Sequence, residues 1–378
     1  MIKRTKFILA CFCLLLMSAC GDRIDVEKAT VSLVYGFDVD GGDKVIVYQV
    51  NPVFDKEAKK KYEVYWTKMD TTRQASDAFD SMTNGLVAKG KLQVMMFSKQ
   101  MLKKENILPY LDIIYRDPKN TGNLRMVMVK ESVSSIVNSK FTDKPILPMY
   151  ITNVIDVGKR SNNTAFTTVQ QFHSLVFDKG ITPAISEIKK GKNAIIVTGS
   201  ALLDDRGLYK MSLNRRESSL LLMLQKKTQT PISLTVRMPS LSLKIQNVRQ
   251  NGEGSDFVTI NIHRLRHSIS TDYEKNHFSF DVKMNLDISI AERTFDVKME
   301  KEQEQLAAII ADQLEKELNG LIRKVQKKHL DPFGFGWYAR AYQYQQWKKV
   351  DNRWPDEFSR AAVTVTPTIK IKTYGAVE

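Results

Sequence analysis

The first twenty residues constrain this chain most, because they predict that everything after them is exported. Three positive charges within the first six residues precede an uncharged run from Phe7 to Ala19, and Cys20 follows. This order of charged, apolar and small residues is that of a secretory signal peptide. The uncharged run has thirteen residues, whereas a helix needs about 20 apolar residues to cross a bilayer core. Residues 1–19 are therefore expected to be a cleaved signal peptide.

Cys20 is expected to carry lipid. Met17-Ser18-Ala19-Cys20 resembles a lipobox, in which the cysteine thiol receives diacylglycerol before cleavage between Ala19 and Cys20, although leucine is more usual than Met17. Cys11 and Cys13 leave with the signal peptide, so Cys20 has no second thiol with which to form a disulfide. Two acyl chains hold a protein stably on a membrane. The alternatives are an ordinary signal peptide with a chance cysteine and an uncleaved anchor.

Length and charge narrow the classes of protein further. A chain of 378 residues is too long for a single small core, so two or three domains are expected. The net charge of +15 falls to +12 when the three cations of the signal peptide are removed. Export separates this basic chain from nucleic acid, so the anionic partner available to it is a lipid headgroup surface. Lys56 and Lys59–Lys61 form the densest basic cluster, which is either a contact with that surface or a solvated loop.

Apolar patterning predicts an α+β protein with largely antiparallel sheets. Strands and helices are mixed without a repeating βαβ period, which disfavours a doubly wound parallel sheet. The change in character near residue 200 predicts an N-terminal region, 20–199, and a C-terminal domain, 200–378. The expected strands are 31–35, 44–48, 92–97, 126–129, 194–203, 208–211, 232–238, 241–248, 257–263, 278–290 and 362–372, and helices are expected within 71–90, 105–115, 132–140, 145–180 and 216–226.

The strongest predicted element is a long amphipathic C-terminal helix, from about Glu302 to Lys328. Acidic residues lie at its start and basic residues at its end, which is favourable for the helix dipole. Gly320 lies inside it and costs about 1 kcal/mol relative to alanine, and Pro332 ends it. The apolar stripe expected to be buried is made of Ile310, Leu314, Leu318, Leu321 and Val325.

No pattern in the chain predicts catalysis, a metal site or a cofactor. The sequence has no CxxC zinc pattern after the signal peptide, no GxGxxG and no Walker loop. His263 and His267 would share one face of a helix, but their segment reads as a strand, in which four residues span about 13 Å. Ser186-Glu-Ile-Lys189 matches the SxxK pattern of penicillin-recognising enzymes, but no Lys-Thr-Gly follows. A binding or assembly protein is therefore expected, and not an enzyme.

Several short segments have an order and spacing that are fairly specific together. They are Cys20–Arg23, Val34–Asp38, Leu108–Asp117, Gly199–Leu208, Asp331–Gly336, Trp347-Lys348, Trp354, Phe358 and Gly375. In this order they resemble the Ger(x)C family, the lipoprotein C subunits of spore germinant receptors, and they cover nearly the whole chain after the signal peptide. Gly21 departs from the family, which usually has tryptophan after the lipidated cysteine.

The resemblance implies a three-domain α+β fold, with two N-terminal domains and one C-terminal domain. It implies a lipoprotein anchored through diacylglyceryl-cysteine at Cys20 on the outer face of the spore inner membrane. There, the family assembles with two integral membrane partners, the A and B subunits, into a receptor that nutrients trigger to start germination. The resemblance implies no catalytic residue and no cofactor.

Aromatic residues after the long helix are candidates for docking to the partner subunits. Phe333, Phe335, Trp337 and Tyr338 are interspersed with glycines, and exposed aromatic side chains are enriched at protein interfaces. The other interpretation is that this segment packs onto the long helix. Arg116-Asp117-Pro118 likewise is either a partner contact or an ion pair that closes a helix.

Two other functions compete with the receptor subunit. A solute-binding lipoprotein that delivers ligand to a transporter would also be anchored by lipid, but that class usually has two lobes of repeating βα units. An envelope hydrolase would need a nucleophile with an adjacent base, and the sequence shows no such constellation.

Overall fold

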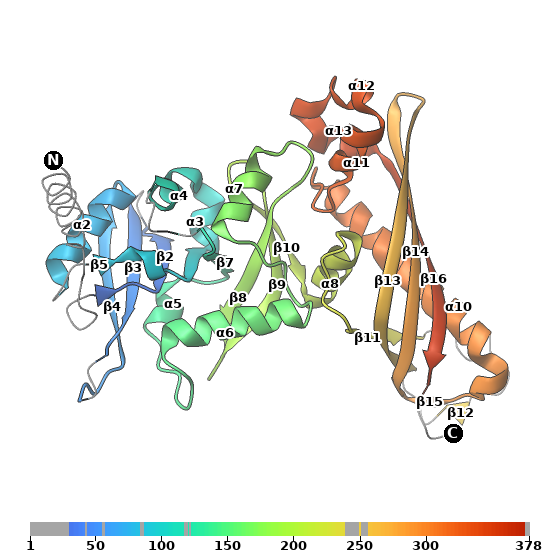
Figure 1. The fold of residues 1–378 in the computed structure, drawn as a ribbon, viewed down its shortest axis with the longest axis horizontal. Coiled ribbons are helices and arrows are strands. Elements are labelled where there is room, and N and C mark those ends of the chain that lie inside the picture. The colour runs from blue at the N-terminus through green and yellow to red at the C-terminus, as the bar shows by residue number, and fades with distance from the viewer. Residues whose placement is uncertain are drawn as a thin grey trace, which may run out of the picture.

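Two sheets of different size organise the chain in this computed structural model. The structure describes residues 30–41, 44–54, 57–83, 87–116, 120, 122–238, 249–250 and 256–374. An eight-stranded sheet in the N-terminal half and a four-stranded sheet in the C-terminal half lie towards opposite ends of an elongated molecule, with helix α8 (Arg215–Leu224) between them (Figure 1). Ala19, Cys20, Lys56, Asp117, Pro118, Gly375 and the expected strand 241–248 lie outside the described residues.

The eight-stranded sheet has the strand order β10-β9-β8-β7-β6-β2-β3-β4. Its four central strands, from β8 to β2, run parallel, and the outer strands pair antiparallel. A short parallel pair joins β1 (Thr30–Val31) to β5 (Val87–Ala88). The bounds are β2 (Val34–Val39), β3 (Val45–Pro52), β4 (Tyr62–Met69), β6 (Val94–Ser98), β7 (Arg125–Val129), β8 (Ala184–Lys190), β9 (Ile195–Leu203) and β10 (Tyr209–Asn214).

The parallel centre of this sheet corrects the prediction of largely antiparallel sheets. β6 is buried at all five residues and β7 at four of five, as is typical of parallel strands covered on both faces. The connections between successive parallel strands contain different sets of helices and strands, so the sequence shows no repeating βαβ period. They contain α2 (Thr72–Met82) after the β3–β4 hairpin, then α3 (Lys99–Lys104) and α4 (Leu108–Arg116), then α5 (Ser134–Val137), α6 (Leu147–Arg160) and α7 (Val169–Phe177).

Each face of this sheet has its own hydrophobic core, because successive side chains of a strand point to opposite faces. Met95 and Phe97 of β6 belong to one core, with Phe172 of α7. Met96 of the same strand belongs to the other core, with Ile151 of α6. The helices therefore cover both faces of the sheet, as Figure 1 shows.

The C-terminal sheet has the order β11-β13-β14-β16 and a single buried face. Every second residue of β14 from Phe278 to Ile290 is buried, and the residues between them are partly or fully exposed. This alternation is that of a sheet packed on one side only. The bounds are β11 (Ile232–Arg237), β13 (Phe257–Glu274), β14 (His277–Arg293) and β16 (Ala362–Thr373), with a separate pair of β12 (Arg249–Gln250) and β15 (Phe295–Asp296).

Helix α10 (Met299–Gln326) packs along the buried face of this sheet (Figure 1). Ile310, Leu314 and Leu318 are among its buried residues. Its polar Asn319 is bonded to β16, because the side chain both donates to Val365 O and accepts from Val365 N, each at 3.0 Å. The helix is therefore attached to the edge strand by hydrogen bonds as well as by apolar packing.

The third core joins the two sheets. It contains Leu202 of β9 and Leu213 of β10 together with the residues of α8 and the C-terminal sheet. The predicted division near residue 200 falls within β9, and the eight-stranded sheet continues to Asn214. Three short helices, α11 (Phe335–Tyr342), α12 (Tyr344–Trp347) and α13 (Trp354–Arg360), complete the C-terminal half. Within the described ranges, none of the helices combines the length and apolar character needed to span a membrane.

We predict that Gly320→Ala stabilises the protein, by about 0.5 to 1 kcal/mol. Gly320 lies inside α10 and a Cβ atom there would meet nothing within 4 Å, so alanine gains helix propensity without a clash. Leu318→Ala, two residues away in the same helix, removes a fully buried side chain and should destabilise by about 2 to 5 kcal/mol. Denaturant unfolding of both variants checks this, and destabilisation by Gly320→Ala would contradict it.

Candidate functional site at the junction of the two halves

A buried carboxylate, Asp331, lies where the two halves meet. One carboxylate oxygen accepts the N–H of Gly334 at 3.0 Å, and the other accepts the N–H of Gly336 and the indole N–H of Trp354, each at 2.9 Å. The backbone of Asp331 pairs with Thr182 of the N-terminal half, whose N–H donates to Asp331 O at 2.7 Å and whose Oγ1 accepts from Asp331 N at 2.9 Å. One residue thus binds its own loop, the helix α13 and the opposite half.

Two glycines of this loop are required by its geometry. Gly334 has a φ of +81°, a left-handed conformation that glycine adopts readily. A Cβ atom on Gly336 would lie 2.5 Å from the Cα atom of Gly180 in the N-terminal half. Because backbone meets backbone at this point, no side chain fits there without moving the two halves apart.

Ion pairs surround this contact. Lys179 lies 3.3 Å from the carboxylate of Asp351 and donates to the side chain of Asn352 at 2.5 Å. Arg340 of α11 pairs with Asp178 at 3.3 Å. The cations of these pairs, Lys179 and Arg340, are 47% and 43% exposed, so solvent screens each pair and the pairs add little. The apolar core and the Asp331 network hold the junction.

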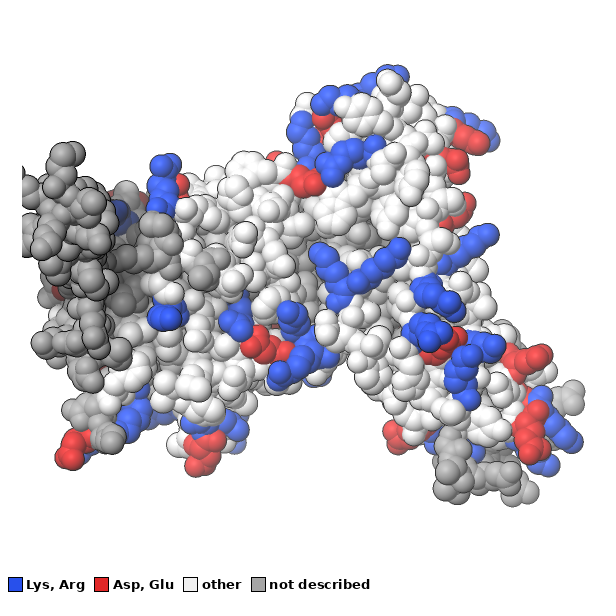
Figure 2. Space-filling view, in the orientation of Figure 1, with Lys and Arg blue, Asp and Glu red and all other residues white. Residues whose placement is uncertain are grey.

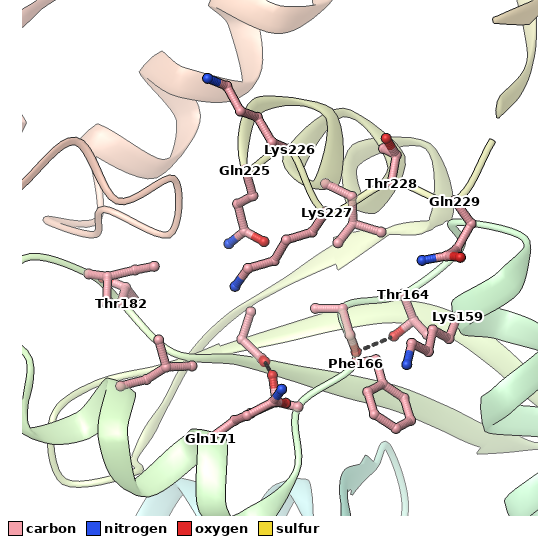
Figure 3. Close-up of a pocket in the computed structure, with 16 residues that line it drawn as sticks. Lys159, Thr164, Phe166, Gln171, Thr182, Gln225, Lys226, Lys227, Thr228 and Gln229 are labelled. Carbon is pink, nitrogen blue, oxygen red and sulfur yellow. Dashed lines mark hydrogen bonds between the residues drawn. The ribbon is translucent and has the colours of Figure 1, made fainter. Parts of the chain in front are cut away.

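A pocket of about 360 Å³ opens beside this contact, between the two halves. Its lining comes from the end of α6, from the segment between α6 and β8, which includes α7, and from α8 with the residues that follow it (Figure 3). On the face shown in Figure 2, basic side chains gather around this middle part of the molecule. The residues that line the pocket are Lys159, Thr164, Ala165, Phe166, Thr167, Gln171, Leu175, Ile181, Thr182, Ala184, Leu222, Gln225, Lys226, Lys227, Thr228 and Gln229.

The lysines of the pocket point in different directions. The ammonium group of Lys159 lies 4.0 Å from the centre of the Phe166 ring, and that of Lys227 points into the pocket, whereas that of Lys226 points away (Figure 3). Although the Lys227 side chain is exposed as a whole, the partial burial of its ammonium group lowers its pKa. Sequence analysis missed these residues, because segments distant in the chain bring them together.

The aromatic residues predicted to dock partners divide into two pairs. Phe333 and Phe335 are only 4% and 2% exposed and belong to the core around α10. They present no surface to a partner, so the docking prediction is corrected for these two residues, and the packing interpretation holds for them. Trp337 and Tyr338 are partly exposed, and for them docking stays a prediction.

The other residues that the sequence offered for chemistry lie in the two sheets. Ser186 is buried in β8 and its hydroxyl donates to Ala165 O at 2.8 Å. His263 is exposed and His267 is buried on the same strand, β13. Within the described part of the chain, no three metal-binding side chains gather in one place.

We predict a pH signature for Asp331. Burial raises its pKa to about 6, although the N–H groups of Trp354, Gly336 and Gly334 act in the opposite direction. The folded state therefore holds this proton more tightly than the unfolded chain, and the stabilisation is full below about pH 4 and lost as the pH rises through about 6. The free energy of unfolding of the wild type minus that of Asp331→Asn should therefore decrease as the pH rises through this window, by on the order of 3 kcal/mol.

Denaturant unfolding at several pH values measures this difference. Asp351→Asn is the matched control, because the hydrogen bond from Lys348 lowers the pKa of Asp351. Its contribution is present above the unfolded pKa and lost as the pH falls, so its difference from wild type should grow with rising pH. A difference for Asp331→Asn that also grows with pH would contradict the prediction.

Comparison with known proteins finds a matching family model for each half of the chain. The family model described as spore germination protein N-terminal domain matches residues 22–190, and the model described as spore germination B3/GerAC like, C-terminal, matches residues 198–375. The spore germination protein GerQC of Bacillus cereus is 18% identical over 318 residues, which cover 84% of each chain.

The fold also has a counterpart among solved structures. The crystal structure of the GerBC protein matches with a TM-score of 0.55 and 15% identity, covering 89% of this chain and 96% of that chain. This likeness supports the fold, with its mixed sheets and several domains. The two family models extend over nearly all of the sequence in the expected order, and the chain therefore belongs to the Ger(x)C family, the C subunits of spore germinant receptors, and has a role in spore germination.

Proposed function

We propose that this chain is the lipid-anchored subunit of a germinant receptor, held by diacylglyceryl-cysteine at Cys20 on the outer face of the spore inner membrane. There it assembles with two integral membrane subunits, A and B, and takes part in the response to nutrients without catalysing a reaction. The observation that carries the proposal is the match of both halves to spore germination family models. The two sheets differ in size and topology, so they give no support to a solute-binding lipoprotein with two similar lobes.

The path of the N-terminal strands supports an anchor at one end of the molecule. Leu33 N donates to Val50 O at 3.1 Å, and β2 pairs antiparallel with β3. The chain therefore enters at Thr30 beside the end of β3, where the β3–β4 connection begins. Nine residues, Gly21–Ala29, lie between Cys20 and Thr30, so the Cα atoms of Cys20 and Thr30 are at most roughly 35 Å apart. A lipid on Cys20 thus keeps this end of the sheet close to the bilayer.

The β3–β4 end has a surface compatible with a membrane. Phe54 is 58% exposed there, and Lys59 and Lys60 are exposed nearby. Each basic residue close to an anionic bilayer adds about 1 kcal/mol to binding, and an exposed ring adds apolar contact. We propose that this end faces the membrane, as the basic cluster in the sequence suggested.

A second surface, on α11 and α12, is the proposed contact with the partner subunits. Tyr342 is 66% exposed and Tyr344 is 54% exposed. Tyr338 stacks on Tyr342 with ring centres 6.4 Å apart, and the ring centres of Tyr344 and Trp347 lie 6.5 Å apart. These two aromatic pairs make up the aromatic surface of α11 and α12. Tyrosine and tryptophan are enriched at the energetically important positions of interfaces.

For the anchor, we predict that Cys20→Ala releases the protein from the membrane fraction and abolishes its contribution to germination. Cys13→Ala is the matched control, because it removes a thiol that lies within the expected signal peptide. Mass spectrometry of the N-terminal peptide should find diacylglycerol on Cys20 in the wild type and in the control. An unmodified Cys20 thiol in the wild type would overturn the anchor.

For the partner contact, we predict that replacing Tyr342 and Tyr344 by serine reduces co-purification of the integral membrane subunits at least tenfold, since aromatic anchors contribute on the order of 1 to 2 kcal/mol each. Phe177→Ser is the control, because Phe177 is equally exposed, at 66%, but lies on α7. Quantitative recovery from spore membranes measures the effect. Equal recovery with the double variant and the control would show that this surface does not dock the partners.

A further inference from the structure

The pocket at the junction has an unbalanced positive charge. In the part of the chain that the structure describes, the charged residues that line it are Lys159, Lys226 and Lys227, with no aspartate or glutamate. Among the described residues, none of these lysines has a carboxylate within ion-pair distance. Lys226 points away from the pocket (Figure 3), so Lys159 and Lys227 give the pocket its positive charge, which attracts an anion.

The segment that carries Lys227 is held in place on both sides. Gln225 Nε2 donates to Pro332 O at 2.5 Å. The N–H of Gln229 donates to Asn162 Oδ1, and the side-chain amide of Asn162 donates back to Gln229 O, each at 2.7 Å. Because these bonds hold the segment before and after Lys227, the place from which this side chain enters the pocket is set by the fold.

The lining also suits a small organic molecule better than a bare ion. Phe166, Leu175, Ile181 and Leu222 contribute apolar surface, and the glutamine and threonine side chains contribute polar groups. A volume of about 360 Å³ is near the lower end of the roughly 300 to 1,000 Å³ typical of small-molecule sites. The pocket therefore suits a small molecule with a charged end and a short body.

The pocket lacks the features that usually bind phosphate. Its described lining contains no arginine and no glycine, and the first N–H groups of the adjacent α7 are already bonded. Val169 N donates to Leu124 O at 2.8 Å, Gln170 N to Gly122 O at 3.0 Å, and Gln171 N to the Thr168 hydroxyl at 3.2 Å. No free helix N-terminus is left for a phosphate group.

We infer that this pocket binds a small organic carboxylate, whose charged group lies between Lys227 and Lys159 and whose body packs against Phe166. The lysines come from opposite halves of the molecule, so the ligand bridges them. Because the native junction is needed to form the site, binding stabilises the folded arrangement by mass action. The inference does not depend on lipid attachment, so the binding test gives the same answer whether or not Cys20 is modified.

The test uses the full chain, extracted from membranes in a mild detergent and held at constant ionic strength. Citrate, succinate, L-glutamate and inorganic phosphate are titrated calorimetrically, and each is also tested for its effect on Tm. We expect saturable binding of at least one carboxylate and an increase in Tm. Lys227→Met should weaken the affinity at least tenfold, whereas Lys192→Met, which removes an equal charge from an exposed turn outside the pocket, should change it less than twofold.

Four results would overturn the inference. The first would be that no carboxylate saturates the protein below about 10 mM, a concentration beyond which we would treat binding as non-specific. The second would be that phosphate binds and the carboxylates do not, and the third that Lys192→Met weakens binding as much as Lys227→Met. If Lys227→Met does not fold, Lys159→Met takes its place, and unchanged carboxylate affinity in that variant would equally exclude the site.

Discussion

The hydrogen bonds of the Asp331 carboxylate are the interaction on which the arrangement of the two halves depends. Three N–H donors converge on it inside the protein, and each would cost about 1 to 3 kcal/mol if left buried without an acceptor. The same residue pairs with Thr182 through its backbone. The carboxylate thus shapes the loop that lets Gly336 approach Gly180, and this approach positions the pocket, α11 and the aromatic surface relative to the eight-stranded sheet.

Much of the fold follows from the sequence, because single-faced elements have clear periods. β14 alternates buried and exposed residues over its length, and α10 occupies nearly the range that its apolar stripe predicted. The parallel centre of the N-terminal sheet was missed because β6 and β7 are buried on both faces. Such strands are short apolar runs without alternation, and a run of this kind does not reveal which neighbours it pairs with or in which direction.

The junction was only partly accessible from the sequence. Asp331–Gly336 stood out as a motif, and the structure gives the reason, because the loop needs an acceptor at its start and glycines where backbone approaches backbone. Phe333 and Phe335 were candidates for docking because glycines beside aromatic residues suggest an exposed loop, and packing onto the long helix was the other interpretation. The loop folds inward, so packing is what the structure has. Lys159 and Lys227 carry no local signal, since only tertiary structure brings α6 next to the end of α8.

Hydrogen exchange of the backbone amides tests the central claim, that the Asp331 network joins the two halves, most directly. Gly334, Gly336 and Thr182 donate their N–H groups within this network, so their exchange should be slow and should require opening of the junction. In Asp331→Ala, all three amides should exchange faster together, while amides in the centre of β6 stay protected. Fast exchange of these three amides in the wild type, at the rate of an open surface loop, would contradict the account.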